Sequence, residues 1–215
     1  MTMMMKPGLT ALALGLSLGL AALATQGAMA QETATAPAAA VTVDDISIGA
    51  PDAKVQITEY ASFTCPHCAS FHAQNWDKLK AEYIDTGKVR FTLREVYFDR
   101  YGLWAAMMAR CGGEMRYYGI VDILFETQTD WAASQDPNAV VANLRKIGRT
   151  AGMDDATIDA CMKDGAMAEA MVARYETNFA ADGVEGTPTI FINGVKHSNM
   201  GYDDLKALVD AELAK

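Results

Sequence analysis

The sequence predicts a mixed α/β fold in which a block of helices is inserted into a small β-sheet. Three observations lead to this fold class. A strand pattern, a helical pattern and a second strand pattern follow one another between residues 55 and 93. Between about residues 100 and 181, apolar residues recur only at helical spacing. A further strand, the hairpin signal Asn193-Gly194 and a final helix then follow.

A short strand and a β-α-β unit are expected to form the first half of the sheet. Ile46 and Ile48 flank Ser47 and indicate the short strand. Residues 55–60 alternate between apolar and polar side chains and predict a second strand, which residues 66–83 follow with a helical pattern. Residues 89–93 alternate again, as is typical of a strand near a sheet edge. Since a connection of this length joins parallel strands, the last two strands should be parallel.

The inserted block is predicted to consist of amphipathic helices alone. Apolar side chains three or four positions apart mark these helices around residues 104–111, 117–125, 140–147, 158–162 and 167–179. Residues 189–192 and 195–198 then predict a β-hairpin, and residues 202–213 a closing helix. We therefore expect a sheet domain over 44–98 and 182–215 and a helical domain over 99–181.

An export signal is expected at the N-terminus. Residues 1–30 carry one basic residue, Lys6, then an uncharged apolar run over 9–23, and end in Ala-Met-Ala, the pattern that precedes a cleavage site. Residues 31–43 are expected to form a flexible leader. The net charge of −9, or −10 without Lys6, argues against binding to nucleic acids or anionic membranes. Export would place the chain where disulfides persist.

The tetrapeptide Cys65-Pro66-His67-Cys68 is the strongest functional signal. It follows the strand at 55–60 and opens the helix at 66–83, and Pro66 is tolerated in a first helical turn. Two cysteines at this spacing can form a disulfide, and a helix N-terminus favours a thiolate at Cys65. Because a stabilised thiolate favours the reduced pair, the oxidised pair should donate its disulfide to other thiols.

These features together resemble the DsbA family of exported thiol oxidases, which have a thioredoxin fold with a helical insertion. The resemblance rests on the CPHC motif, its position, the insertion, the export signal and Gly186-Thr187-Pro188 before a strand, and it covers nearly all of residues 44–215. It implies that Cys65 is the exposed nucleophile and Cys68 the buried resolving thiol.

The resemblance also implies substrates, location and partners. The substrates would be reduced, folding proteins in the periplasm, and a quinone-linked membrane protein would re-oxidise the cysteine pair. No cofactor is implied. A monomer is expected, because the segment between the predicted cleavage site and the first strand is too short for the dimerisation domain of isomerase relatives. A disulfide isomerase or reductase of the same fold is the alternative.

Two titratable side chains are candidates for tuning the cysteines. His67 can hydrogen-bond to the Cys65 thiolate or attract it when charged; otherwise it is a surface histidine. Glu59 lies six residues before Cys65, on the same face of its strand as Ile57, so it is expected to point inward with a raised pKa. Such a carboxyl group could relay protons to Cys68, and the family carries an acidic residue at this offset. A solvated glutamate at a strand edge is the alternative.

Thr187 and Pro188 are the candidate substrate-binding residues. By resemblance, the peptide bond between them is cis, packs against the cysteine pair and exposes the Thr187 backbone to an extended substrate. An ordinary trans proline that begins a strand is the alternative. The best-known DsbA pattern has valine before this proline, whereas threonine is more typical of isomerase-type relatives. Thr187 therefore leaves the balance between oxidase and isomerase open.

Cys111 and Cys161 remain if Cys65 pairs with Cys68. Each lies on the apolar face of a different predicted helix, and we interpret them as a structural disulfide within the helical block. Two free thiols or a second redox pair are the alternatives.

Metal binding is the rival class of function. Cys65, Cys68 and His72 have half of a zinc-site spacing, but the chain has only three histidines and no second CxxC motif. His72 falls on the inward face of its helix and is interpreted as a core residue, so no metal site is predicted.

Overall fold

The computed structural model describes residues 41–215. The predicted signal peptide (1–30) and the predicted leader up to residue 40 lie outside the described residues. The strands are β1 (Ser47–Ile48), β2 (Val55–Ala61), β3 (Val89–Glu95), β4 (Thr189–Ile192) and β5 (Val195–His197). The helices are α1 (Pro66–Leu79), the π-helical turn η1 (Lys80–Ile84), α2 (Arg100–Cys111), α3 (Glu114–Glu126), α4 (Gln128–Trp131), α5 (Pro137–Thr150), α6 (Asp155–Met162), α7 (Gly165–Ala181) and α8 (Tyr202–Leu213). Within residues 41–215, no helix is long and apolar enough to cross a membrane.

The strands form one mixed sheet in the order β1-β3-β2-β4-β5. β2 and β3 are parallel, from Val55 opposite Val89 to Ala61 opposite Glu95, and α1 connects them. The other neighbouring strands are antiparallel. The mixed α/β fold class is therefore confirmed, and β3 is separated from the edge only by the short β1.

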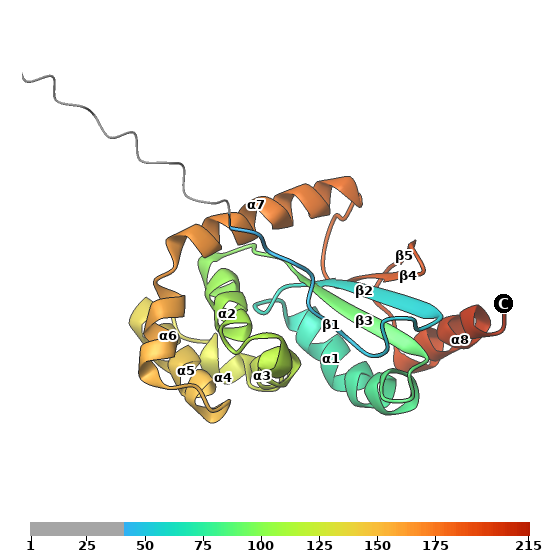
Figure 1. Cartoon of the computed structure of the whole chain (residues 1–215), viewed down its shortest axis with the longest axis horizontal. Coiled ribbons are helices and arrows are strands. Elements are labelled where there is room, and N and C mark those ends of the chain that lie inside the picture. Colours follow the sequence, from blue (N-terminus) through green and yellow to red (C-terminus); the bar gives the residue numbers. More distant parts are fainter. Residues whose placement is uncertain (1–40) are drawn as a thin grey trace, which may run out of the picture. The chain divides into compact units, whose positions relative to one another are not determined.

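Helices cover both faces of this sheet. In Figure 1, α7 runs along one face, and α1 and α8 lie on the other. On β2, Val55, Ile57 and Ala61 belong to the main core. Tyr60 points to the opposite face, where its ring packs edge-on against Phe179 of α7 at 6.4 Å between centroids. The two-residue period of a strand thus divides β2 between two apolar layers.

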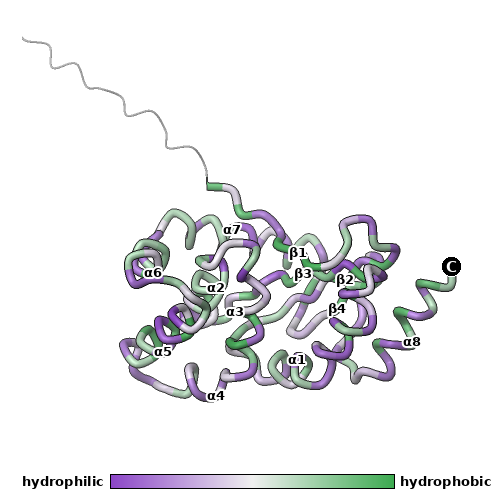
Figure 2. Tube along the Cα trace, turned by 60° about the horizontal axis from the view of Figure 1, so that its bottom comes forward, coloured by the Kyte–Doolittle hydropathy of each residue, from purple (hydrophilic) through white to green (hydrophobic). Residues whose placement is uncertain are grey.

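The inserted helices share the main core with the sheet. One cluster of buried side chains contains Leu93 of β3 together with Met108, Leu144 and Ile158 from α2, α5 and α6. Figure 2 shows these helices alternating between polar and apolar segments, as expected when one face of each is buried. Since α7 also covers the sheet, the division into domains at 99 and 181 remains an interpretation.

Two short elements differ from the prediction. The helix expected over 66–83 ends as an α-helix at Leu79 and continues through η1, in which the Asp85 N–H donates to the Lys80 carbonyl at 2.8 Å. Tyr83 stays buried in this turn, so the apolar spacing does not reveal the change of hydrogen-bond register. The sequence also gave no sign of α4, because four residues are too few for a period.

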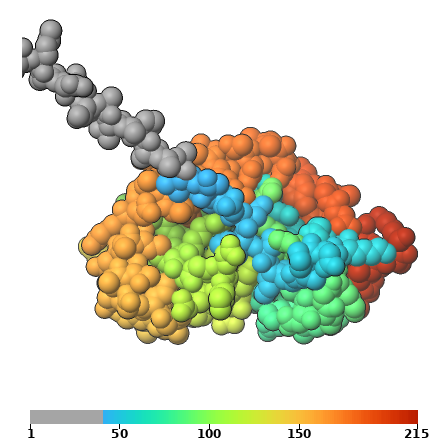
Figure 3. Space-filling view, viewed as in Figure 1, coloured from blue at the N-terminus to red at the C-terminus, as the bar shows by residue number. Residues whose placement is uncertain are grey.

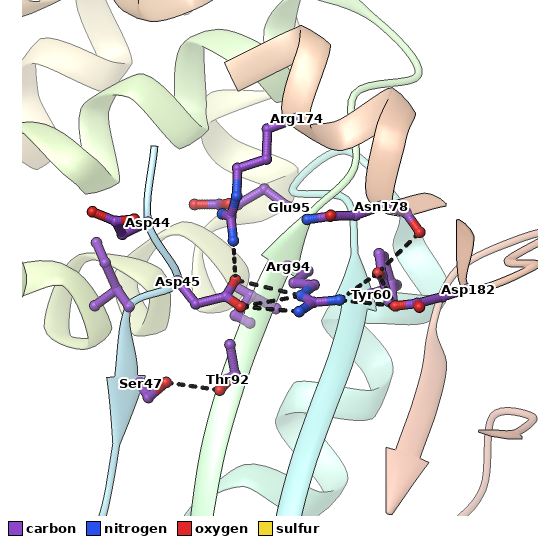
Figure 4. A network of polar contacts seen from close by, with 12 residues as sticks. Asp44, Asp45, Ser47, Tyr60, Thr92, Arg94, Glu95, Arg174, Asn178 and Asp182 are labelled. Carbon is purple, nitrogen blue, oxygen red and sulfur yellow. Dashed lines mark hydrogen bonds and ion pairs between the residues drawn. The ribbon is translucent and has the colours of Figure 1, made fainter. Parts of the chain in front are cut away.

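A polar cluster joins the chain before β1 to the sheet and α7. Figure 3 shows the segment after residue 40, in blue, lying on the surface against α7, in orange. We call Asp45, Tyr60, Arg94, Arg174 and Asp182 the Arg94 network (Figure 4). Arg94 donates to Asp45 at 3.0 Å, and to Asp182 and the Tyr60 hydroxyl at 2.8 Å each. Arg174 of α7 donates to Asp45 at 2.7 Å.

Candidate active site

The cysteine pair lies next to the turn that precedes β4, at one end of the sheet. Cys65 is the N-cap of α1, directly after the loop that leaves β2. The Thr187–Pro188 peptide bond is cis, as the resemblance implies, and it directly precedes β4. The Cys65 thiol donates to the Thr187 carbonyl, with 3.6 Å between Sγ and O. Because β2 and β4 are hydrogen-bonded neighbours, the segments at their ends lie side by side.

Opposing effects set the pKa of the Cys65 thiol. Partial burial raises this pKa, because it weakens solvation of the thiolate. The nearby Thr187 hydroxyl, the N–H and thiol of Cys68 and the N–H of His67 stabilise the thiolate and lower the pKa. These donors outweigh burial, and the pKa of Cys65 lies below its ordinary value. The exposed N-terminus of α1 therefore favours a thiolate at Cys65.

Cys68 is placed in the opposite environment. Its side chain is fully buried, and burial is the main reason why its pKa is raised far above the ordinary value. The negative charge of Glu59 raises this pKa further. In the reduced pair, the environment consequently favours a thiolate at Cys65 and a protonated thiol at Cys68.

Glu59 lies in the interior, as its position on the strand predicts. Its side chain is 3% exposed, on the central strand β2, and Oε1 has no hydrogen-bond partner among residues 41–215. Burial, and then the charge on Cys65, raise the pKa of Glu59 to about 8. A carboxyl group with this pKa keeps its proton at neutral pH.

Pro66 and His67 are exposed in the first turn of α1. Pro66 occupies the first helical position, where the absence of an N–H costs no hydrogen bond. Within the described residues, the His67 side chain makes no hydrogen bond, and the group of His67 that acts on Cys65 is its backbone N–H. A role of the imidazole in tuning Cys65 stays a prediction.

The Thr187 hydroxyl acts on both sulfur atoms. Its oxygen is buried and has no hydrogen-bond partner within residues 41–215. The hydroxyl nevertheless lowers the pKa of Cys65 and opposes the rise of the pKa of Cys68. A pocket of about 350 Å³ adjoins this turn and is lined by residues 185–189, which include Thr187 and Pro188, and by residues 196–199.

Cys111 of α2 and Cys161 of α6 are bonded to each other, with 5.8 Å between their Cα atoms. The predicted pairing is therefore confirmed, and it links two helices of the inserted block. Cys65 and Cys68 are both free thiols.

His72 lies among aromatic side chains of the core. Its Nε2 lies 3.3 Å from Oδ1 of Asp122, and its buried ring stacks on Trp76 at 5.2 Å and lies 4.9 Å from Phe125. Within residues 41–215, no three His, Cys, Asp or Glu side chains are grouped so that they could hold a metal ion.

The structure adds two residues that the sequence did not single out. Gln128 of α4 donates to the carbonyl groups of Phe63 and Cys65, and Asp99 accepts a hydrogen bond from Thr64 at 2.6 Å. Both come from segments far from Cys65 in the sequence. The N-cap position of Asp99 could be read from the helix that follows it, but its contact with Thr64 could not.

Comparisons with known proteins agree with this arrangement. The family model described as thioredoxin matches residues 41–211. A putative protein-disulfide oxidoreductase of Rickettsia bellii is 33% identical over 170 residues, which are 78% of this chain and 64% of that protein. Disulfide bond formation protein D of Bacillus subtilis is 24% identical over 77% of this chain and 76% of that protein. The crystal structure of α-DsbA1 of Wolbachia pipientis has a TM-score of 0.74 and 26% identity, and covers 81% of this chain and 93% of that chain.

The extent of these matches determines what they show. The chain spans slightly less than two thirds of the length of the Rickettsia relative. The family match, in contrast, includes every strand of the sheet, both cysteine pairs and the cis-proline turn. On this evidence the chain belongs to the thioredoxin family, and its structural neighbours are DsbA proteins with an inserted helical domain.

Proposed function

We propose that the protein is a thiol:disulfide oxidoreductase that donates the Cys65–Cys68 disulfide to reduced, folding proteins. The observation that carries this proposal is the asymmetry of the pair. The pKa of the accessible Cys65 is lowered at a helix N-terminus, whereas that of the buried Cys68 is raised. Stabilising the Cys65 thiolate stabilises the reduced pair, so reduction of the Cys65–Cys68 disulfide becomes more favourable. The relatives named protein-disulfide oxidoreductase support the same reaction.

The first step is attack on the accessible sulfur. A substrate thiolate attacks Sγ of Cys65, the Cys65–Cys68 bond breaks, and a mixed disulfide joins Cys65 to the substrate. The sulfur of Cys68 leaves with the electron pair and needs a proton, because burial strongly disfavours its thiolate. We assign this proton to Glu59, whose raised pKa keeps it protonated at neutral pH.

The second step releases the product. Another substrate thiolate attacks the substrate sulfur of the mixed disulfide, a disulfide forms within the substrate, and Cys65 leaves as its stabilised thiolate. Two electrons have then passed from the substrate to the cysteine pair. By resemblance, a quinone-linked membrane protein would accept these electrons and restore the disulfide.

Substrate binding is assigned to the turn before β4. Thr187 lies against Cys65, and its backbone could pair with an extended substrate segment as an added strand. Pro188 would fix the direction of this turn. We infer that the protein acts as a monomer in the periplasm. The predicted export signal and the Cys111–Cys161 disulfide, which fits an oxidising compartment, support this location.

Oxidation of a reduced, unfolded protein by the purified, pre-oxidised chain tests this function. Wild type should form disulfides in the substrate stoichiometrically, and Cys65→Ser should abolish the reaction because it removes the attacked sulfur. Ser70→Ala, an exposed change in the same helix, is the control. Persistent oxidation by Cys65→Ser would exclude Cys65 as the reacting residue. An equilibrium with glutathione that favours the oxidised pair would instead support the reductase or isomerase alternative.

A further inference from the structure

The helical insertion reaches the cysteine pair through one buried amide. Gln128 is the first residue of α4, and its side chain is 7% exposed. Its Nε2 lies 2.8 Å from the carbonyl oxygen of Phe63 and 3.0 Å from that of Cys65. One NH₂ group carries two donors in a fixed plane, so a single side chain holds the backbone on both sides of Thr64.

These two carbonyl groups belong to the segment that orients Cys65. The Cys65 carbonyl accepts from the N–H groups of Cys68 and Ala69, at 3.1 and 3.2 Å, and so begins α1. The Phe63 carbonyl receives no other hydrogen bond within residues 41–215, and Phe63 itself is buried. Gln128 is therefore the partner that satisfies this buried carbonyl.

The same segment is held from its other side by the start of α2. Oδ2 of Asp99 accepts from the Thr64 hydroxyl at 2.6 Å, while Oδ1 accepts from the first N–H groups of α2. Asp99 is exposed, whereas Gln128 is buried, so the amide contact is the better shielded from water. Both contacts come from the insertion.

We propose that Gln128 is a positioning residue: it fixes the backbone of Phe63 and Cys65 at the start of α1, so that Sγ of Cys65 stays against the Thr187 carbonyl at the N-terminus of the helix, and the helical insertion thereby contributes to the reactivity of the cysteine pair. The proposal rests on the proposed function. Its physical basis is that a helix N-terminus stabilises a negative charge only within its first turn, so the Cys65 thiolate is stabilised only while its sulfur is held there. A residue that merely packed α4 against the loop would contribute to stability without affecting the thiolate.

Gln128→Leu tests the proposal, because leucine has a similar size and no donor. The thiolate absorbance of reduced Cys65 is titrated against pH, and the equilibrium with glutathione and the thermal unfolding are measured on the same protein. We expect a higher pKa for Cys65 and a glutathione equilibrium shifted about three- to tenfold towards the oxidised pair, the size of one net hydrogen bond. Gln128→Glu, which keeps the side-chain length but replaces donors by acceptors, should shift both in the same direction.

Asn143→Leu is the matched control. The Asn143 amide also donates to a backbone carbonyl of α4, that of Asp130 at 3.3 Å, but it makes no hydrogen bond to the Phe63–Cys65 segment within residues 41–215. It should leave the pKa of Cys65 and the glutathione equilibrium at the wild-type values. If Gln128→Leu and Gln128→Glu lower thermal stability while the pKa stays unchanged, or if Asn143→Leu shifts it equally, the positioning role is wrong. The titration needs no substrate, so this outcome is distinguishable from a wild-type protein that fails to oxidise thiols.

Discussion

Glu59 is a carboxyl group that the fold buries at a cost in stability. It sits on the central strand with one oxygen unpaired among residues 41–215, in a position where an apolar side chain would pack without a desolvation penalty. The charge on Cys65 and the proton of Glu59 influence each other, since each ionisation disfavours the other. A replacement of Glu59 that stabilises the fold is therefore expected to slow thiol–disulfide exchange at the cysteine pair, as is common where a polar group is buried for function.

We predict that Glu59→Gln stabilises the reduced protein in a pH-dependent way. The pKa of Glu59 is about 8 in the folded state against 4.5 ordinarily, so the folded state holds the extra proton between these values. The contribution of Glu59 to the free energy of unfolding is complete below about pH 4.5 and is lost as the pH rises to about 8. The variant should match wild type near pH 5 and exceed it by a few kcal/mol at most at pH 8.

Urea unfolding of both proteins at pH 5 and pH 8 measures this difference. Glu169→Gln, an exposed change on α7, should show no pH-dependent gain. Oxidation of substrate by Glu59→Gln should be slower, since Cys68 then lacks its proton donor. Equal pH dependence in wild type and Glu59→Gln would mean that Glu59 ionises in the folded protein as it does in the unfolded chain.

At the scale of elements, the sequence predicted what depends on local pattern. The alternation over 55–60 placed Glu59 on the inner face, and the motif at 65–68 placed Cys65 at a helix start; the structure has both. It could not predict contacts between distant segments. Gln128 approaches Cys65 across 63 positions, and nothing in its local sequence distinguishes it from a surface glutamine. The Arg94 network was missed for the same reason, because its members come from the chain before β1, from β2, from β3 and from α7 with its C-cap.

We predict that Arg94→Met lowers the free energy of unfolding by about 1–2 kcal/mol at pH 7, a modest value because these side chains are about a quarter to a third exposed. Burial raises the pKa of Asp45, but hydrogen bonds from Arg94 and Arg174 outweigh it, so the pKa is lowered. The stability from Asp45 is thus present above its ordinary pKa of 3.8 and is lost as the pH falls through the lower folded value. The effect of Arg94→Met should shrink in strong acid.

Chemical denaturation at pH 7 and pH 3 checks this prediction. Arg90→Met is the control, because Arg90 lies on the same strand and its side chain makes no hydrogen bond or ion pair within residues 41–215. A loss at pH 7 that is equal for the two variants would show that the effect comes from replacing any arginine of β3. The network would then contribute nothing specific to the contact between β3, α7 and the chain before β1.

At the scale of the whole molecule, the shared core makes the insertion and the sheet depend on each other. Buried side chains of β3, α2, α5 and α6 form one cluster, and the Cys111–Cys161 disulfide closes a loop of 50 residues on the insertion side of it. A chain with one continuous core is expected to unfold in one transition. A disulfide in the insertion should then stabilise the cysteine pair's surroundings as well as its own two helices.

We therefore predict that the double variant Cys111→Ala/Cys161→Ala is less stable by about 2–5 kcal/mol and still unfolds in a single transition. The chain-entropy model gives about 4 kcal/mol for a loop of this length. Tryptophan fluorescence and far-UV circular dichroism, followed together through denaturation, should report the same midpoint. Oxidation of substrate below that midpoint should be close to that of wild type, because neither cysteine contacts Cys65.

In wild type, mild reduction with glutathione should open Cys65–Cys68 and leave Cys111–Cys161 intact, since no stabilised thiolate favours opening of the second pair. Non-reducing peptide mapping separates the outcomes: a mixed Cys65–Cys111 linkage, or lost oxidation in the folded double variant, would make the insertion a carrier of electrons instead of a support for the fold.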